Sequence, residues 1–234
     1  MKLIDSFSQL YDKSVTTYVS SFNNVCQVDE HGASATFHNL YIHNHSATFY
    51  LFDTKLIQDH KDTTEKMSSV IKNSTCDGVA LVYGADKSEH LIFAELKSNY
   101  SAGRLQDAFE QLIYSLLKYH RLFSLCKDYD LETLTLDFVL ACHAPNKALE
   151  SEAFLDEMSE QNVNGTEDLG CSFVKDILPA IQISRSKSFK FSLGQLQKIS
   201  FFPLNVKLMN KCVTLHLVMS ARPTDDHATI NFNY

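Results

Sequence analysis

Apolar side chains recur along this chain with helical and strand-like periods in alternation. Over residues 4–22 they return every three or four positions, which predicts an amphipathic first helix. β-prone residues fill 34–42 and 46–52, and the turn-prone polar tripeptide 43–45 between them favours a hairpin. A polar helix is expected over 58–72.

The central part of the chain carries the strongest periodicity. Two apolar runs, 77–84 and 90–97, are joined by a short polar turn, which predicts adjacent antiparallel strands. From Ser101 to about Lys127 apolar residues repeat every three or four positions, so we expect a long helix with Ser101 as its N-cap. A further buried strand is predicted over 134–142. The core is therefore expected to be α/β.

The remainder of the chain has a weaker pattern. An acidic helix is expected over 147–160, and the polar, glycine-containing segment 161–170 is the best candidate for an internal boundary. We accordingly divide the chain into a core with the first helix and hairpin, 1–160, and C-terminal strands that complete or extend the same domain, 161–234. Residues 206–210 and 212–221 are expected to form a strand pair, with a peripheral tail from Arg222.

The charge balance restricts the kind of partner. A net charge of −7 over 234 residues argues against broad, nonspecific wrapping of nucleic acid, which needs many cationic side chains. The segment from Arg185 to Lys211 nevertheless has six basic residues and no acidic one. It can face phosphates in a local cleft, or it can be a solvated surface with acidic neighbours from elsewhere in the fold, and both alternatives stay open.

Several functional classes find no support in the sequence. Asp5 and Asp12 interrupt any apolar run at the amino terminus, and no stretch of about 18 apolar residues occurs elsewhere, so we expect a cytoplasmic protein without a membrane partner. There is no glycine-rich phosphate loop. No GxSxG nucleophile elbow is present either, which lowers the expectation of a serine hydrolase.

Acidic residues stand at the ends of the two central strands. Asp77 begins the first apolar run, while Glu95 and Lys97 end the second and share one sheet face because they are two residues apart. An antiparallel pairing brings these ends together. Two carboxylates and an ammonium at one sheet edge are costly without compensation, and carboxylate oxygens are ligands that Mg²⁺ prefers. Mg²⁺ is therefore the expected cofactor, with Mn²⁺ as a substitute.

The same residues carry a family resemblance. The order of these residues resembles the PD-(D/E)xK nuclease superfamily. An Asp is followed after about eighteen residues by Glu-x-Lys at a strand end and then by a helix with a Gln. The resemblance implies a restriction-endonuclease-like core, a central mixed β-sheet flanked by helices. It also implies that Asp77, Glu95 and the Leu96 carbonyl bind metal, that Lys97 assists the attacking water, and that Gln111 lies beside the site.

The match to this family has departures and competitors. Cys76 replaces the proline that usually precedes the first acid, and Tyr114 comes one residue early for the glutamine–tyrosine motif of RecB-type members. Many members add a Glu from an earlier helix, for which Glu65 is the best-placed candidate. Acid-x-Lys triplets also begin at Asp53 and Asp59. Asp59 lies in a predicted helix, and Asp53 ends a strand but lacks a preceding strand that begins with an acid.

The leading hypothesis is a metal-dependent DNA endonuclease of a restriction or anti-phage defence system. One alternative is a nuclease-fold binding or assembly subunit whose protein partner supplies the nucleic-acid contacts. Another is RNA cleavage, since the same metal chemistry acts on either backbone. A homodimer is compatible with cutting both strands of DNA, because that requires two sites.

Overall fold

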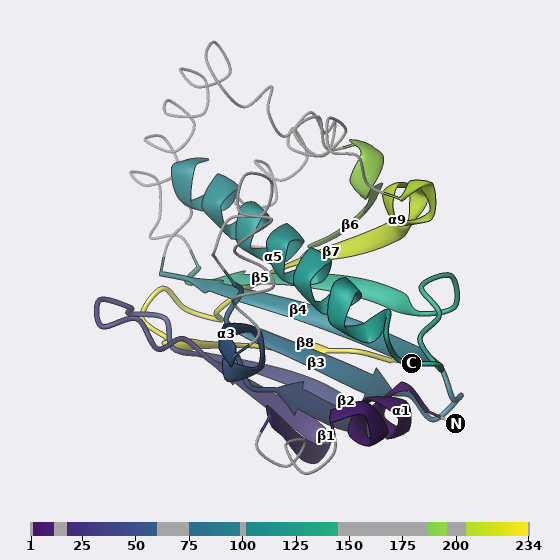
Figure 1. Cartoon of the computed structure of the whole chain (residues 1–234). Helices are drawn as coiled ribbons and strands as arrows, with labels where there is room; N and C mark the ends of the chain where they lie inside the picture. The colour runs from purple at the N-terminus through teal and green to yellow at the C-terminus, as the bar shows by residue number, and fades with distance from the viewer. Residues whose placement is uncertain are drawn as a thin grey trace.

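A computed structural model describes residues 2–11, 18–59, 75–98, 102–144, 187–195 and 205–233 of the chain. Eight strands, four α-helices and one short 3-10 helix lie within these ranges (Figure 1). In chain order they are α1 Leu3–Tyr11, β1 Val19–Asp29, β2 Asn39–Phe52, α3 Lys55–Asp59, β3 Gly78–Tyr83, β4 Glu89–Lys97, α5 Ala102–Phe123, β5 Thr135–Cys142, β6 Lys187–Ser192, η3 Leu193–Gln195, α9 Val206–Asn210, β7 Cys212–Met219 and β8 His227–Asn231.

The strands form one mixed sheet in the order β1-β2-β3-β4-β5-β7-β6, and β8 pairs with β2. β3 and β4 are antiparallel, β4, β5 and β7 run parallel, and β6 returns antiparallel to β7. Helix α5 crosses one face of the central strands (Figure 1). The expected α/β class, with a central mixed sheet and flanking helices, is confirmed.

The predicted hairpin around 43–45 is wrong, because 39–52 is one long strand. Its second half pairs with β3 and its first half with β8, while β1 pairs with both halves. Residues 44–47 face only Asn24, which has a positive φ of 66°, so the strand is bulged there. The turn-prone tripeptide thus bends β2 without reversing it, because a continuous partner strand keeps the chain extended.

Other departures from the sequence prediction follow from strand pairing or, for α9, from a local helix cap. The first helix ends at Tyr11, and Val19–Phe22 pair with β2 as part of β1. Val206–Asn210 form α9 and not a strand, because Asn205 caps them with its side-chain oxygen 2.8 Å from the Lys207 N–H. The tail beyond Arg222 is not peripheral, since β8 adds to β2 in parallel.

Several expected elements lie outside the described residues. These are most of the helix over 58–72, the N-cap Ser101, the acidic helix over 147–160 and the boundary over 161–170. Strands β6, β7 and β8 from the second half of the chain join the same sheet as β1–β5. None of the described helices has the length and apolar character to cross a membrane.

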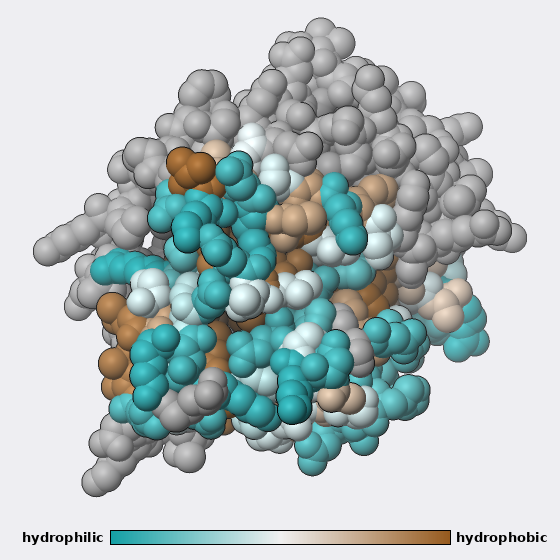
Figure 2. Space-filling view, turned by 90° about the vertical axis from the view of Figure 1, so that its right-hand side faces the viewer, coloured by the Kyte–Doolittle hydropathy of each residue, from teal (hydrophilic) through white to brown (hydrophobic). Residues whose placement is uncertain are grey.

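Apolar clusters cover both faces of the sheet. On the α5 face, Phe7, Phe52, Phe93, Tyr119 and Phe123 pack with ring centroids 5.4–6.0 Å apart. On the other face, the bent β1–β2 ribbon and β8 cover smaller residues of the central strands. Hydrophilic side chains cover most of the described part of the face in Figure 2. The central strands are therefore buried on both sides, which explains their nearly continuous apolar sequences.

A close approach between β1 and β3 requires glycine at position 78. A Cβ added there would lie 2.5 Å and 2.7 Å from the two methyl carbons of Val28, which is itself buried. Val28 is branched at Cβ and has few alternative rotamers. This contact places the start of β3, and with it Asp77, against the end of β1.

Gly78→Ala is expected to lower the free energy of unfolding by about 1–3 kcal/mol, because the new methyl group overlaps Val28. Urea denaturation of the single variants and of Gly78→Ala/Val28→Ala would measure this. The double variant should be more stable than the sum of the two single effects predicts. Strict additivity would contradict the contact.

Candidate active site

The antiparallel pairing of β3 with β4 brings the predicted acidic residues to one end of the sheet. Gly78 lies opposite Ala94, so Asp77 immediately before β3 faces the stretch that contains Glu95. The Asp77 Oδ2 atom accepts a hydrogen bond from the Leu96 N–H at 2.7 Å. The predicted adjacency of these two strands is confirmed, and a backbone contact anchors the Asp77 carboxylate.

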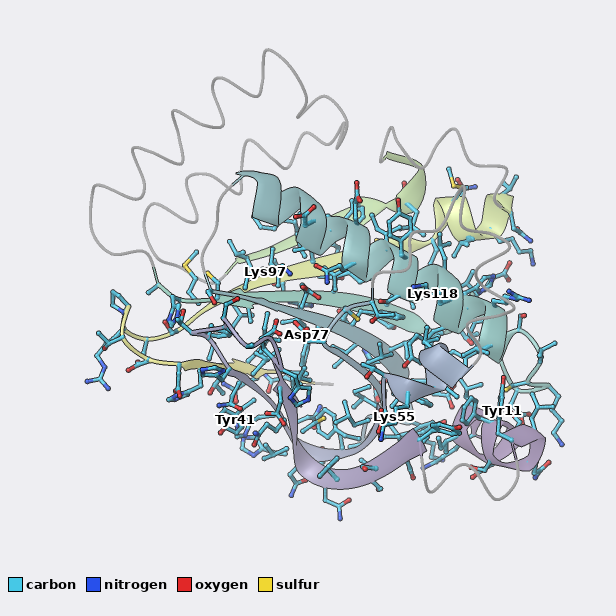
Figure 3. The ribbon with its side chains drawn as sticks, turned by 60° about the vertical axis from the view of Figure 1, so that its left-hand side comes forward. Tyr11, Tyr41, Lys55, Asp77, Lys97 and Lys118 are labelled. Carbon is cyan, nitrogen blue, oxygen red and sulfur yellow. The ribbon has the colours of Figure 1, made fainter. Side chains whose placement is uncertain are left out.

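Lys97 connects the acidic pair to helix α5. Its Nζ donates to Glu95 Oε1 and, at 2.8 Å, to Gln111 Oε1. The Gln111 Nε2 atom in turn donates to the carbonyl of Thr75 at 3.2 Å. Figure 3 shows Lys97 and Asp77 below α5, with Lys118 farther along the helix. The structure thus brings Asp77, Glu95, Lys97 and Gln111 together. Side-chain hydrogen bonds link Glu95, Lys97 and Gln111, and Asp77 joins them through the Leu96 N–H.

The Glu95 carboxylate is fully buried, with 0% of the residue exposed. Lys97 satisfies Oε1, but no described group forms a hydrogen bond with Oε2. Burial raises the pKa of Glu95 well above its ordinary value, and the Asp77 charge adds to this, while Lys97 acts in the opposite direction. A buried oxygen without a partner is costly in the protein alone, so this atom is available to an external cation or proton.

Asp77 is electrostatically coupled to the same group. Burial raises its pKa to about 7; the Leu96 N–H lowers it, the Glu30 carboxylate raises it and Lys97 lowers it again. Ionising both carboxylates therefore places more negative charge in the site than Lys97 alone compensates. Such a group favours the uptake of positive charge.

Glu30 is a site residue that the sequence analysis missed. It follows β1, its Oε1 accepts the Gly32 N–H at 2.6 Å, and its charge acts on both Asp77 and Glu95. No local motif marks it, because its approach depends on the close contact between the end of β1 and the start of β3, where Val28 meets Gly78. Glu65, which the sequence suggested for an additional carboxylate, lies outside the described residues.

A pocket of about 530 Å³ opens beside Lys97 and Gln111. Its lining includes Glu30, Asp107 and Glu110, so the entrance to the site is acidic. A phosphate group entering this pocket meets net negative charge unless cations accompany it.

The competing acid-x-Lys triplets take other roles where they are described. Asp53 caps α3, with its Oδ1 accepting the Lys55 N–H at 2.8 Å, and its side chain is exposed. Asp59 ends the same short helix, and the remainder of its triplet lies outside the described residues. Neither participates in the hydrogen bonds of the Glu95 group that the structure describes.

The basic segment is only partly described, and two of its lysines lie away from the site. Lys207 forms an ion pair with Glu132 at 2.7 Å, and Lys211 donates to the Glu132 carbonyl at 2.9 Å. They precede β7, which runs parallel to β5 and β4, whereas Glu95 lies near the end of β4. These two lysines therefore occupy the opposite end of the sheet, with an acidic neighbour of their own.

No family model, curated protein or solved structure matches the chain. Within the described residues, no three His, Cys, Asp or Glu side chains form a group arranged to hold a metal ion.

Glu95→Gln is expected to raise the melting temperature at pH 8 in EDTA by about 2–6 °C, because the neutral amide removes a buried charge. An acid whose folded pKa is raised loses stability as pH rises above its unfolded pKa. The native protein should therefore lose stability between pH 5 and pH 8, and the variant should lose less. Thermal unfolding followed by circular dichroism would measure this.

Asp107→Asn is the matched control for this experiment, since Asp107 is an exposed carboxylate of the same pocket. It should leave the difference between pH 5 and pH 8 unchanged. If the stability of Glu95→Gln depended on pH in the same way as that of the native protein, this would contradict the conclusion that the buried Glu95 charge is costly.

Proposed function

We propose that this chain is a metal-dependent nuclease with a restriction-endonuclease-like core, and that Asp77, Glu95, Lys97 and Gln111 form its active site. The observation that carries the proposal is the fully buried Glu95 carboxylate, which pairs with Lys97 through one oxygen and leaves the other without a described partner. The mixed sheet and the helix packed over it are compatible with the PD-(D/E)xK arrangement.

The donor set fits a hard divalent cation. Asp77 and Glu95 would hold it together with the Leu96 carbonyl, which lies on the same strand edge as the Leu96 N–H bound to Asp77. Mg²⁺ commonly binds through one or two carboxylates and keeps several waters, so a third acidic ligand is not required. Glu30 is the additional carboxylate near enough to affect Asp77. When bound, Mg²⁺ or Mn²⁺ supplies Lewis-acid charge and a water of lowered pKa.

Lys97 and Gln111 provide positioning in this site. Lys97 holds its ammonium beside Glu95, where it can donate to a phosphate oxygen or orient a water. Gln111 fixes that ammonium from α5 while bonding to the Thr75 carbonyl near the start of β3. The helix thereby keeps the lysine directed to the strand ends.

The proposed substrate is DNA, cleaved internally, in a restriction or anti-phage defence setting. The acidic pocket and the net charge of −7 favour a local, cation-dependent contact over extensive phosphate binding. RNA cleavage and a partner subunit that supplies nucleic-acid contacts are alternatives that the first experiment separates, and a homodimer is compatible with DNA cleavage because cutting both strands requires two sites.

Purified protein should nick supercoiled plasmid in the presence of Mg²⁺ or Mn²⁺ at low salt, and EDTA should stop the reaction. Asp77→Ala, Glu95→Ala and Lys97→Ala should each lower the rate on the order of 10²–10³-fold, because each removes a charge at the reacting phosphate. Asp53→Ala is the control and should retain activity. Equal activity in all four variants would reject the site.

The pattern of inactivity also discriminates among the alternatives. Cleavage of single-stranded RNA without plasmid nicking would reassign the substrate. Absence of cleavage on both substrates, with Glu95→Ala indistinguishable from the native protein, would favour the binding or assembly subunit.

Gln111→Ala should reduce the nicking rate by about tenfold without eliminating it, because Lys97 loses one of its two described hydrogen-bond partners and becomes less well oriented. Gln111→Glu is the informative companion, since a carboxylate can still accept from Lys97 but cannot donate to the Thr75 carbonyl. An unchanged nicking rate in Gln111→Ala would show that Gln111 is a surface amide without a role in the reaction.

A further inference from the structure

A second polar network lies on the sheet face opposite α5. Asp137 of β5 is at its centre, with Oδ1 2.9 Å from His216 Nε2 and Oδ2 3.3 Å from His90 Nδ1. Each histidine then contacts a serine: His216 Nδ1 lies 2.8 Å from Ser188 Oγ, and His90 Nε2 lies 3.0 Å from Ser88 Oγ. Two serine–histidine arms therefore share one aspartate.

The hydrogen bonds determine where the protons lie. Burial by itself raises the pKa of Asp137, but the hydrogen bonds with His216 and His90 outweigh it and hold the pKa below its ordinary value. The ionised carboxylate can only accept, so His216 carries its proton on Nε2. In neutral imidazole the remaining nitrogen, Nδ1, is then the acceptor for the Ser188 hydroxyl. This is the protonation pattern of a general base beside a nucleophile.

Exposure increases along the Ser188 arm. The Asp137 side chain is 5% exposed, that of His216 is 15% exposed, and Ser188 is exposed on the edge strand β6. The His216 ring also packs edge-on against Phe232, with centroids 5.0 Å apart. The base is thus held from two sides, while the hydroxyl is accessible.

A pocket of about 420 Å³ adjoins Ser188 and His216 and is bounded on one side by β8. Phe232 and Asp226 direct their backbone groups to β2, so by alternation Thr229 and Asn231 direct theirs to the other edge of β8. Both residues line this pocket. Their N–H groups are suitable donors to a developing oxyanion. Ile230 and Phe232 give the pocket an apolar wall.

We propose that Ser188, His216 and Asp137 form a second, metal-independent catalytic site that hydrolyses a small carboxylic ester with an apolar acyl group. The Ser188 oxygen bonds to the ester carbonyl carbon as its proton passes to His216 Nδ1. The bond from that carbon to the alcohol oxygen breaks, and the alcohol leaves with this proton. Water then adds to the acyl-serine, its proton passing through His216 back to Ser188 as the carboxylic acid leaves.

The Ser88 arm is the internal control for this site. Ser88 makes the same type of contact through His90 to Asp137, but it is half-buried and is absent from the lining of this pocket. Ser188 alone adjoins the pocket, so a catalytic site there predicts reaction at Ser188 and none at Ser88.

The test is covalent labelling of the full chain with a fluorophosphonate probe, located by peptide mass spectrometry, together with p-nitrophenyl butyrate hydrolysis. We expect one adduct on Ser188, absent from Ser188→Ala and unchanged in Ser88→Ala. His216→Gln should slow labelling about 100-fold or more through loss of the base. Glu95→Gln and EDTA should leave labelling intact, which separates this site from the proposed nuclease.

Failure to form a Ser188 adduct in the native protein would overturn the proposal, as would equal labelling in Ser188→Ala. Circular dichroism checks the fold of each variant. If His216→Gln does not fold, the two serine variants still decide the question, because each removes only one hydroxyl group from the protein.

Discussion

The burial of the Glu95 carboxylate is the constraint on which this end of the sheet depends, because a charge inside a sheet must be compensated by groups held at fixed positions. Lys97 supplies the opposite charge from the same strand, and Gln111 on α5 orients it. Asp77 comes from the neighbouring strand and adds a second carboxylate. The packing of α5 over β4 therefore serves both the core and this polar group, since moving the helix would remove Gln111, one of the two described hydrogen-bond partners of Lys97.

The sheet separates two polar groups with different chemistry. Glu95 and Lys97 are two and four residues after Phe93, which packs under α5, so they lie on the helix face. Asp137 is two residues before Val139 of the opposite cluster and His216 is two residues before Val218, so both lie on the face that β8 and the bent β2 cover. Because alternate residues of a strand point to opposite faces, the same central strands can hold a carboxylate–lysine group and a serine–histidine–aspartate group without contact between them.

The bend in β2 affects the surroundings of both polar groups. Its bulge over 44–47 lets one strand pair with β3 at one end and with β8 at the other. The bend brings the end of β1 against Gly78, which helps to place Glu30 near Asp77, and the pairing with β8 places that strand beside the pocket at Ser188. Gly78 permits the close contact with Val28 that this curvature brings about. One backbone feature thereby contributes to the surroundings of both proposed sites.

The sequence by itself determined the features that depend on local order. Apolar periodicity located β3, β4, α5 and β5, and the strand-end positions of Asp77, Glu95 and Lys97 predicted that they would meet, because an antiparallel pair has only one compatible arrangement of its ends. Tertiary structure alone decided the continuity of β2 and the pairing of β8, whereas the helical state of Val206–Asn210 follows from the local Asn205 cap. It also decided the approach of Glu30 to Asp77 and of Ser188 to Asp137 through His216, since these partners are far apart in sequence and meet only through strand order and register.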